Sequence, residues 1–167
     1  ETNMAKFEIN HTPTLPKQTN VGIGCVGSGF IMRDVQMVAY NNAGLNIVAV
    51  ASRTPANAQA CADANNVQTV YNTWQELLDD ERVTILDIAY PPDQQLEVVR
   101  EAVKRDHIKG ILAQKPLAMN YAQAKEIVDL CRNAGVALSV NQNMRYDQSM
   151  LALKSLLDQG AFGRPVL

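Results

Sequence analysis

The stretch Val21-Gly22-Ile23-Gly24-Cys25-Val26-Gly27-Ser28-Gly29-Phe30-Ile31-Met32 decides the fold of this 167-residue chain. It begins with an apolar run, 21–26, which predicts a buried strand. Glycines at 27 and 29 predict a turn. A helical pattern follows, with Ile31, Val35 and Val38 at the spacing that puts all three on one helix face. A strand, a glycine-rich turn and a helix in this order are typical of a turn that binds the phosphates of a nucleotide.

Two registers of the dinucleotide fingerprint G-x-G-x-x-G overlap in this stretch. The register that starts at Gly22 matches letter for letter, whereas the one that starts at Gly27 has Met32 in place of the third glycine. The fingerprint needs its first glycine just after the strand, so Gly22 and Gly24 fall inside the strand and the second register is preferred. Two alternatives stay open, a plain turn and another ligand such as S-adenosylmethionine.

The rest of the chain alternates strand and helix patterns, which predicts parallel strands joined by right-handed crossovers. The fold class is therefore α/β, a doubly wound parallel sheet of the Rossmann dinucleotide-binding type. We expect an arm over 1–20, flexible or laid on the surface, a dinucleotide-binding domain over 21–146, and a last helix over 147–167. The expected strands are 21–26, 46–51, 69–71, 83–89, 110–113 and 136–140.

Composition excludes several classes of protein. The formal net charge is −2 and no basic run is present, which argues against nucleic acid as a partner. No apolar run approaches the roughly 18 residues that span a bilayer, so we expect no membrane partner. The cysteines Cys25, Cys61 and Cys131 are too scattered for a zinc site or a disulfide framework. We expect buried free thiols, no metal and a cytoplasmic location.

The end of the second expected strand indicates which dinucleotide would bind. In NAD-binding folds an acidic residue at this place holds the ribose 2′-hydroxyl, but here the chain has Ser52-Arg53-Thr54. The two hydroxyl groups can donate to a 2′-phosphate and the arginine can pair with it. The sequence therefore favours NADP over NAD; the alternative is a solvated loop arginine.

Three further segments follow later strands: Tyr90-Pro91-Pro92, Gln114-Lys115-Pro116-Leu117-Ala118 and Asn143-Met144-Arg145-Tyr146. With the glycine turn, they make the chain from Val21 onward resemble the glucose-fructose oxidoreductase, inositol dehydrogenase and MocA (Gfo/Idh/MocA) family of NAD(P)-dependent oxidoreductases. The resemblance implies hydride transfer between nicotinamide and a sugar or polyol derivative. It also implies a homo-oligomer and a second domain that carries most substrate contacts. We therefore expect this chain to be the nucleotide-binding part of a longer enzyme.

The resemblance assigns the catalytic role to Lys115, which the family places beside the nicotinamide. Two positions depart from the family pattern, since Gln114 stands where the family has Glu and Gln95 where it commonly has His. The predicted cofactor-binding residues are Gly27, Ser28, Gly29, Phe30, Ile31, Ser52, Arg53, Thr54, Tyr90, Pro91, Pro92, Gln95, Gln114, Lys115, Pro116, Asn143 and Arg145.

One alternative function belongs to a different class. Because Gln114 removes a charge next to Lys115, the chain would also suit a non-catalytic NADP-binding sensor or regulatory module. An S-adenosylmethionine-binding domain is a third interpretation, but such a domain also needs an acidic residue after the second strand, and none is present.

Overall fold

The computed structural model describes residues 7–14 and 16–164, which fall into two units. One unit spans 18–141 and contains the sheet. The other combines the described residues of 1–17 with those of 142–164.

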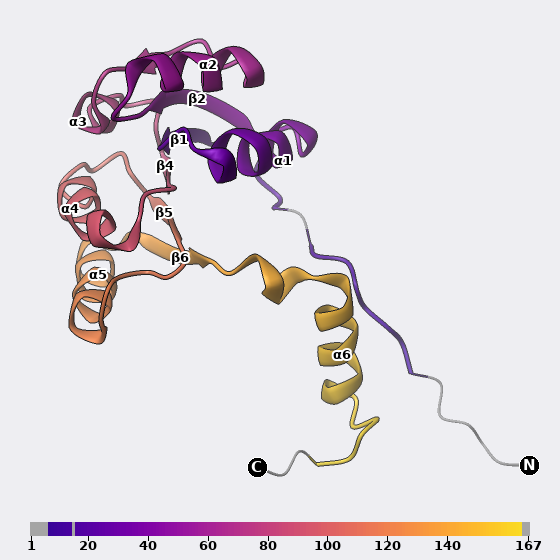
Figure 1. Cartoon of the computed structure of the whole chain (residues 1–167). Helices are drawn as coiled ribbons and strands as arrows, with labels where there is room; N and C mark the ends of the chain where they lie inside the picture. Colours follow the sequence, from indigo (N-terminus) through magenta and orange to yellow (C-terminus); the bar gives the residue numbers. More distant parts are fainter. Residues whose placement is uncertain (1–6, 15, 165–167) are drawn as a thin grey trace, which may run out of the picture. The chain divides into compact units, whose positions relative to one another are not determined.

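The larger unit is built on a six-stranded parallel sheet with the order β3-β2-β1-β4-β5-β6 (Figure 1). The strands are β1 (Gly22–Val26), β2 (Asn46–Ala51), β3 (Val70–Tyr71), β4 (Ile85–Ile88), β5 (Gly110–Gln114) and β6 (Ala137–Asn141). All six lie where the sequence predicted them. The strand order reverses between β1 and β4, and in doubly wound sheets such a switch point is where ligands bind.

Helices follow the strands in the expected alternation. The helical segments of this unit are η1 (Ile31–Gln36), α1 (Met37–Asn42), α2 (Pro55–Asn65), α3 (Trp74–Leu78), α4 (Pro92–Ala102) and α5 (Tyr121–Ala134). Two of these helices begin with side-chain caps. Thr73 and Glu76 form a capping box at α3, and the Asn120 side chain accepts a hydrogen bond from the Gln123 N–H at the start of α5.

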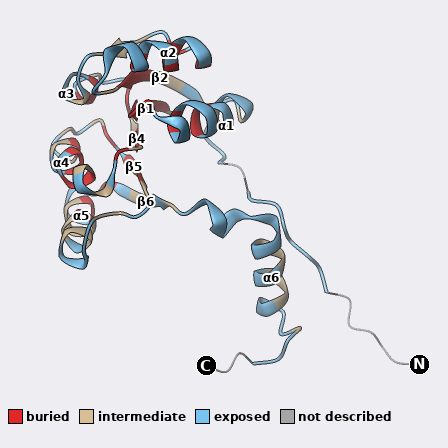
Figure 2. Cartoon of the chain, viewed as in Figure 1, coloured by how far each residue is buried: buried red, intermediate tan, exposed pale blue. Residues whose placement is uncertain are grey.

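Two buried clusters cover the two faces of the sheet. On one face η1, α1 and α2 contribute Met32, Met37 and Cys61, which pack on β1 and β2. On the other face α3, α4 and α5 pack on β1, β2, β4 and β5. Figure 2 shows the buried residues gathered on the strands and on the helix sides that face them. Cys25, Cys61 and Cys131 are buried free thiols, as expected.

The helix after the glycine turn differs from the prediction. Ile31, Val35 and Val38 are all more than 40% exposed, and the buried residues are Met32, Gln36 and Met37 instead. The reason is that η1 is a π-helix, in which the Met37 N–H bonds to the carbonyl of Met32, five residues back. Its wider turns change which residues share a face.

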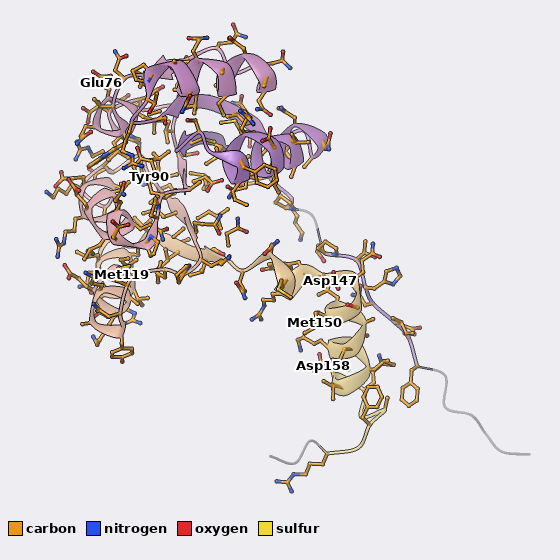
Figure 3. All side chains as sticks on the ribbon, in the orientation of Figure 1. Glu76, Tyr90, Met119, Asp147, Met150 and Asp158 are labelled. Carbon is orange, nitrogen blue, oxygen red and sulfur yellow. The ribbon has the colours of Figure 1, made fainter. Side chains whose placement is uncertain are left out.

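The smaller unit contains a 3₁₀ turn, η2 (Asn143–Tyr146), and the helix α6 (Gln148–Asp158). The N-terminal segment runs along α6, where the Glu8 carbonyl accepts hydrogen bonds from the Ser155 hydroxyl and the Gln159 amide. The spacing of the apolar residues Met150, Leu153 and Leu157 puts them on one face of an α-helix, and all three are exposed in this unit; Met150 is labelled in Figure 3. Among the described residues, no helix is both long and apolar enough to span a membrane.

Candidate functional site

The carboxyl ends of β1, β2 and β4 surround a pocket of about 300 Å³. These strands are neighbours in the sheet, so the residues that follow them meet at one edge although they are far apart in sequence. Tyr90, which is labelled in Figure 3, follows β4 and forms one wall. The lining residues are Gly27, Ser28, Gly29, Ser52, Arg53, Thr54, Asn57, Ala89, Tyr90 and Pro91.

Two glycines shape the floor of this pocket. Gly27 has φ +107°, and a Cβ there would lie 2.9 Å from the carbonyl oxygen of Ala89, so the position requires glycine. A Cβ at Gly29 would have no neighbour within 4 Å, which leaves the backbone open to a ligand. The helix starts at the next residue, and Phe30 gives it no side-chain cap. Open backbone beside an uncapped helix N-terminus is a favourable environment for an anion.

The wall on the β2 side carries hydroxyl groups and a cation. Ser28 Oγ donates a 2.8 Å hydrogen bond to Ser52 Oγ, which joins the glycine turn to the end of β2. The Arg53 guanidinium carbon lies 5.7 Å from the ring centroid of Tyr90, within the range of a cation–π contact. Burial raises the pKa of Tyr90, and the charge of Arg53 opposes that rise. Thr54 is the N-cap of α2, but its side chain makes no capping bond, so its hydroxyl remains available to a ligand.

A second polar element lies at the end of β5. Lys115 directly follows β5, is exposed, and precedes Pro116 through a cis peptide bond. The segment 114–117 is hydrogen-bonded to Gln95 of α4, a side chain that is fully buried. The Gln95 Nε2 group donates to the carbonyls of Gln114 (2.9 Å), Pro116 (3.0 Å) and Leu117 (3.3 Å). Gln95 therefore fixes the backbone on both sides of Lys115.

Comparison with known proteins agrees with this architecture. Residues 21–142 match the Gfo/Idh/MocA family model, described as an oxidoreductase family with an NAD-binding Rossmann fold. The chain belongs to this family. The match covers the sheet unit, from the first strand to just past the last.

Several relatives of this chain are named as dehydrogenases. A D-apiose dehydrogenase from Rhizobium rhizogenes is 30% identical over 141 residues, which cover 84% of this chain and 40% of that protein. An oxidoreductase from Agrobacterium radiobacter, solved with NAD+, L-tartaric acid and magnesium, has a TM-score of 0.82 at 28% identity. The match covers 88% of this chain and 42% of that protein. The myo-inositol dehydrogenase of Lactobacillus casei, solved with NAD(H) and myo-inositol, has a TM-score of 0.79 at 29% identity. The match covers 87% of this chain and 43% of that protein.

The chain spans less than half the length of these Gfo/Idh/MocA relatives, since the matched regions cover between 26% and 43% of the curated proteins. The family's Rossmann unit is thus what the structure describes.

The structure brings together many, though not all, of the residues that the sequence predicted for this Gfo/Idh/MocA site. The pocket lining includes eight of them: Gly27, Ser28, Gly29, Ser52, Arg53, Thr54, Tyr90 and Pro91. Phe30 and Ile31 are exposed in the first helical turn, and Pro92 begins α4. Gln114, Lys115 and Pro116 lie at the end of β5, and Gln95 lies beneath them. Asn143 and Arg145 are exposed residues of η2, in the other unit.

Two pocket residues were missed by the sequence reasoning. Asn57 lies in the first turn of α2, and Ala89 directly follows β4. A signal for Asn57 was present, because the Thr54-Pro55 start places residue 57 in the turn that faces the same sheet edge. Ala89 contributes its backbone beside Gly27, which no side-chain pattern reveals.

The smaller unit has a hollow of its own, of about 450 Å³, between residues 10–14 and α6. Its two charged residues, Lys154 and Asp158, pair with each other at 2.6 Å. Within 7–14 and 16–164, no group of three or more His, Cys, Asp or Glu side chains is arranged to hold a metal ion. The pocket at β1, β2 and β4 is therefore the stronger candidate site.

Proposed function

We propose that this chain binds NADP in preference to NAD and is the nucleotide-binding part of an NAD(P)-dependent oxidoreductase. The observation that carries the proposal is the pocket itself, where the glycine turn, the Ser28–Ser52 hydrogen bond and Arg53 meet at the switch point of the sheet. Membership of the Gfo/Idh/MocA family supports the nucleotide-binding and oxidoreductase part of the proposal, and the preference for NADP rests on Ser52, Arg53 and Thr54.

The residues present fit a dinucleotide. The open backbone at Gly29 and the uncapped helix N-terminus suit a pyrophosphate, with Ser28, Phe30 and Ile31 beside it. Ser52, Arg53 and Thr54 offer donors to a 2′-phosphate, and no carboxylate is among the pocket-lining residues to repel it. Tyr90, Pro91 and Pro92 would lie along the nicotinamide ribose.

Lys115 is the proposed catalytic residue. When bound, the nicotinamide supplies the hydride chemistry. The exposed ammonium of Lys115, on a segment fixed by Gln95, would hold the substrate hydroxyl or move the proton that accompanies the hydride. Gln114 and Pro116, on either side of it in the chain, remain predicted cofactor contacts, and Asn143 and Arg145 remain predicted cofactor-binding residues.

The substrate class is proposed from the relatives, whose names refer to D-apiose and inositol. A small carbohydrate or polyol is accordingly the proposed substrate. The homo-oligomer that the family resemblance implies is likewise a proposal. A cytoplasmic location is proposed because all three cysteines are buried free thiols, as in proteins of reducing compartments.

One observation favours a non-catalytic NADP sensor as the second candidate. Gln114 Oε1 accepts a 2.9 Å hydrogen bond from the Lys115 backbone N–H, so this side chain engages the backbone and brings no charge to the ammonium. A sensor would keep NADP affinity but show no turnover in the full-length protein.

The experiment is calorimetric titration of the chain with NADPH, NADH and S-adenosylmethionine. NADPH binding tighter than NADH binding, with no S-adenosylmethionine binding, is the expected result. Binding of S-adenosylmethionine alone would replace the proposal with a methyl-donor domain. Binding of none of the three would contradict a nucleotide site.

A further inference from the structure

A carboxylate that no part of the proposed chemistry uses lies in the middle of the sheet. Asp87 belongs to β4 and is 1% exposed. Its carboxylate accepts a 2.6 Å hydrogen bond from the Tyr40 hydroxyl and a 3.1 Å hydrogen bond from Gln36 Nε2. Both donors belong to the continuous helical segment, η1 and α1, that begins just after the glycine turn.

Within the part of the chain that the structure describes, no cation pairs with this buried carboxylate. From β1, Cys25 lies in register with Asp87, and from β5 the in-register residue is the apolar Leu112. The helix side contributes Tyr40 and Gln36, and the ion pairs found among the described residues do not involve Asp87.

Among Asp87 and these neighbours, Asp87 is the group that titrates near neutral pH. Burial raises the pKa of Asp87 to about 7, although the hydrogen bonds from Tyr40 and Gln36 oppose the rise. Burial and the charge of Asp87 raise the pKa values of Cys25 and Tyr40, which keeps both of them neutral over the same range.

The carboxylate is close to the proposed pyrophosphate position. Cys25, its register partner, is two residues before Gly27, so Asp87 is roughly 10 Å from the glycine turn at normal strand spacings. The space between them is packed interior. Charges interact more strongly there than they would in water.

We infer that dinucleotide binding at the glycine turn is coupled to proton uptake by Asp87. The inference rests on the proposed function, because it takes the pyrophosphate to lie at Gly27–Gly29. A second negative charge nearby disfavours an ionised carboxylate, so a bound dinucleotide favours the protonated form of Asp87. By linkage the protonated form binds the dinucleotide more tightly, and affinity falls as the pH rises.

The hydrogen bonds allow this proton to enter without breaking the network. With a proton on the oxygen that faces Tyr40, the carboxyl group donates to the phenol, whose hydroxyl turns to accept. Gln36 continues to donate to the other oxygen. The charge is removed and the packing is kept.

The test compares the wild-type chain with Asp87→Asn, in which the amide keeps an acceptor for Gln36 and a donor for Tyr40. NADPH is titrated calorimetrically between about pH 6 and about pH 9. We expect the wild-type affinity to fall about tenfold more than that of the variant, as estimated for charges about 10 Å apart at an effective dielectric constant of about 20. Titration of the ligand's own 2′-phosphate is common to both proteins and cancels.

A second measurement needs no variant. Titration of the wild type with NAD+, which lacks the 2′-phosphate, in buffers of different ionisation enthalpy should show fractional proton uptake above pH 7. Tyr40→Phe gives a directional check: loss of a donor to the ionised form should move the fall in affinity to higher pH. A purely structural role for Tyr40 would weaken binding equally at all pH values.

The outcomes separate the two proposals. Equal pH dependence in the wild type and Asp87→Asn, or NAD+ binding without proton uptake, would overturn the inference and leave the proposed function intact. No binding of NADPH or NAD+ at any pH would overturn both.

Discussion

Ser28 Oγ and Ser52 Oγ are joined by a 2.8 Å hydrogen bond across the carboxyl ends of β1 and β2. The bond connects the turn proposed for the pyrophosphate with the strand end proposed for the adenosine ribose. Ser28 is 9% exposed, so this contact is largely shielded from water. Two halves of the predicted site, 24 residues apart in sequence, therefore form one hydrogen-bonded unit.

Gly29→Ala should separate nucleotide binding from stability. A Cβ at Gly29 has no neighbour within 4 Å, so we expect the free energy of unfolding to change by less than about 0.5 kcal/mol. The added methyl group occupies the space through which a phosphate approaches the backbone, and NADPH affinity should fall at least about tenfold. Urea unfolding and calorimetry measure the two effects.

Gly27→Ala is the contrasting variant. Its φ of +107° and the approach of the Ala89 carbonyl to 2.9 Å should cost about 1 to 3 kcal/mol of stability. A Gly29→Ala variant that binds NADPH with wild-type affinity would show that the open backbone at this turn is not the phosphate site.

Gln95→Leu tests how the Lys115 segment is held. The substitution removes the donor shared by three carbonyls and leaves these acceptors unsatisfied, so we expect a loss of about 2 to 4 kcal/mol. Gln94→Leu, at the neighbouring position, is the control and should change stability by less than about 0.5 kcal/mol. If both variants unfold at the wild-type urea concentration, Gln95 does not hold the segment.

The raised pKa of Asp87 has a consequence for stability that requires no ligand. The carboxyl has a pKa of about 7 in the folded chain against about 3.9 when unfolded. Folding therefore favours the protonated form: the stabilisation is fully present below about pH 4 and is lost as the pH rises through about 7.

Asp87→Asn removes this pH dependence because the amide stays neutral. We expect the variant to be more stable than the wild type at about pH 8.5, by up to about 4 kcal/mol, and nearly equal at about pH 4.5. Urea unfolding of both proteins at the two pH values measures the difference. A stability difference that is the same at both would mean that Asp87 does not titrate in this range.

Lys115→Ala distinguishes the enzyme from the sensor. In the full-length protein we expect turnover to fall by about 10² to 10⁴ with a far smaller loss of NADPH affinity, because Lys115 is one of many predicted cofactor contacts. Lys109→Ala, at the opposite end of β5, is the matched control and should leave turnover unchanged. Dehydrogenase activity that survives Lys115→Ala would remove this residue from the proposed chemistry.

The sheet could be predicted because its signals are local and repeated. Apolar strand runs, the Thr73–Glu76 capping box and Asn120 each specify structure from neighbouring residues. The pocket could be predicted for a topological reason, since parallel strands bring their carboxyl ends to one edge. The residues after β1, β2 and β4 were therefore the ones to examine.

The parts that the sequence did not predict depend on the type of helix that forms and on contacts between distant residues. The spacing of Ile31, Val35 and Val38 assumes an α-helix, whereas η1 is a π-helix that buries Met32 and Gln36. Gln36 and Tyr40 meet Asp87 from 51 and 47 residues away, and the run Ile85–Ile88 otherwise has the pattern of a plain buried strand. No single-sequence periodicity carries such pairings.

The most direct test of the central claim is the ratio of NADPH to NADH affinity in the wild type and in Arg53→Ala. We predict that the wild type prefers NADPH, that the variant loses about 10- to 100-fold in NADPH affinity, and that its NADH affinity is nearly unchanged. Arg100→Ala, which removes an arginine paired with Glu126 on the helix surface, should behave as the wild type. Equal affinities for NADPH and NADH in the wild type, or a preference that survives Arg53→Ala, would contradict the assignment of this pocket as a site for NADP.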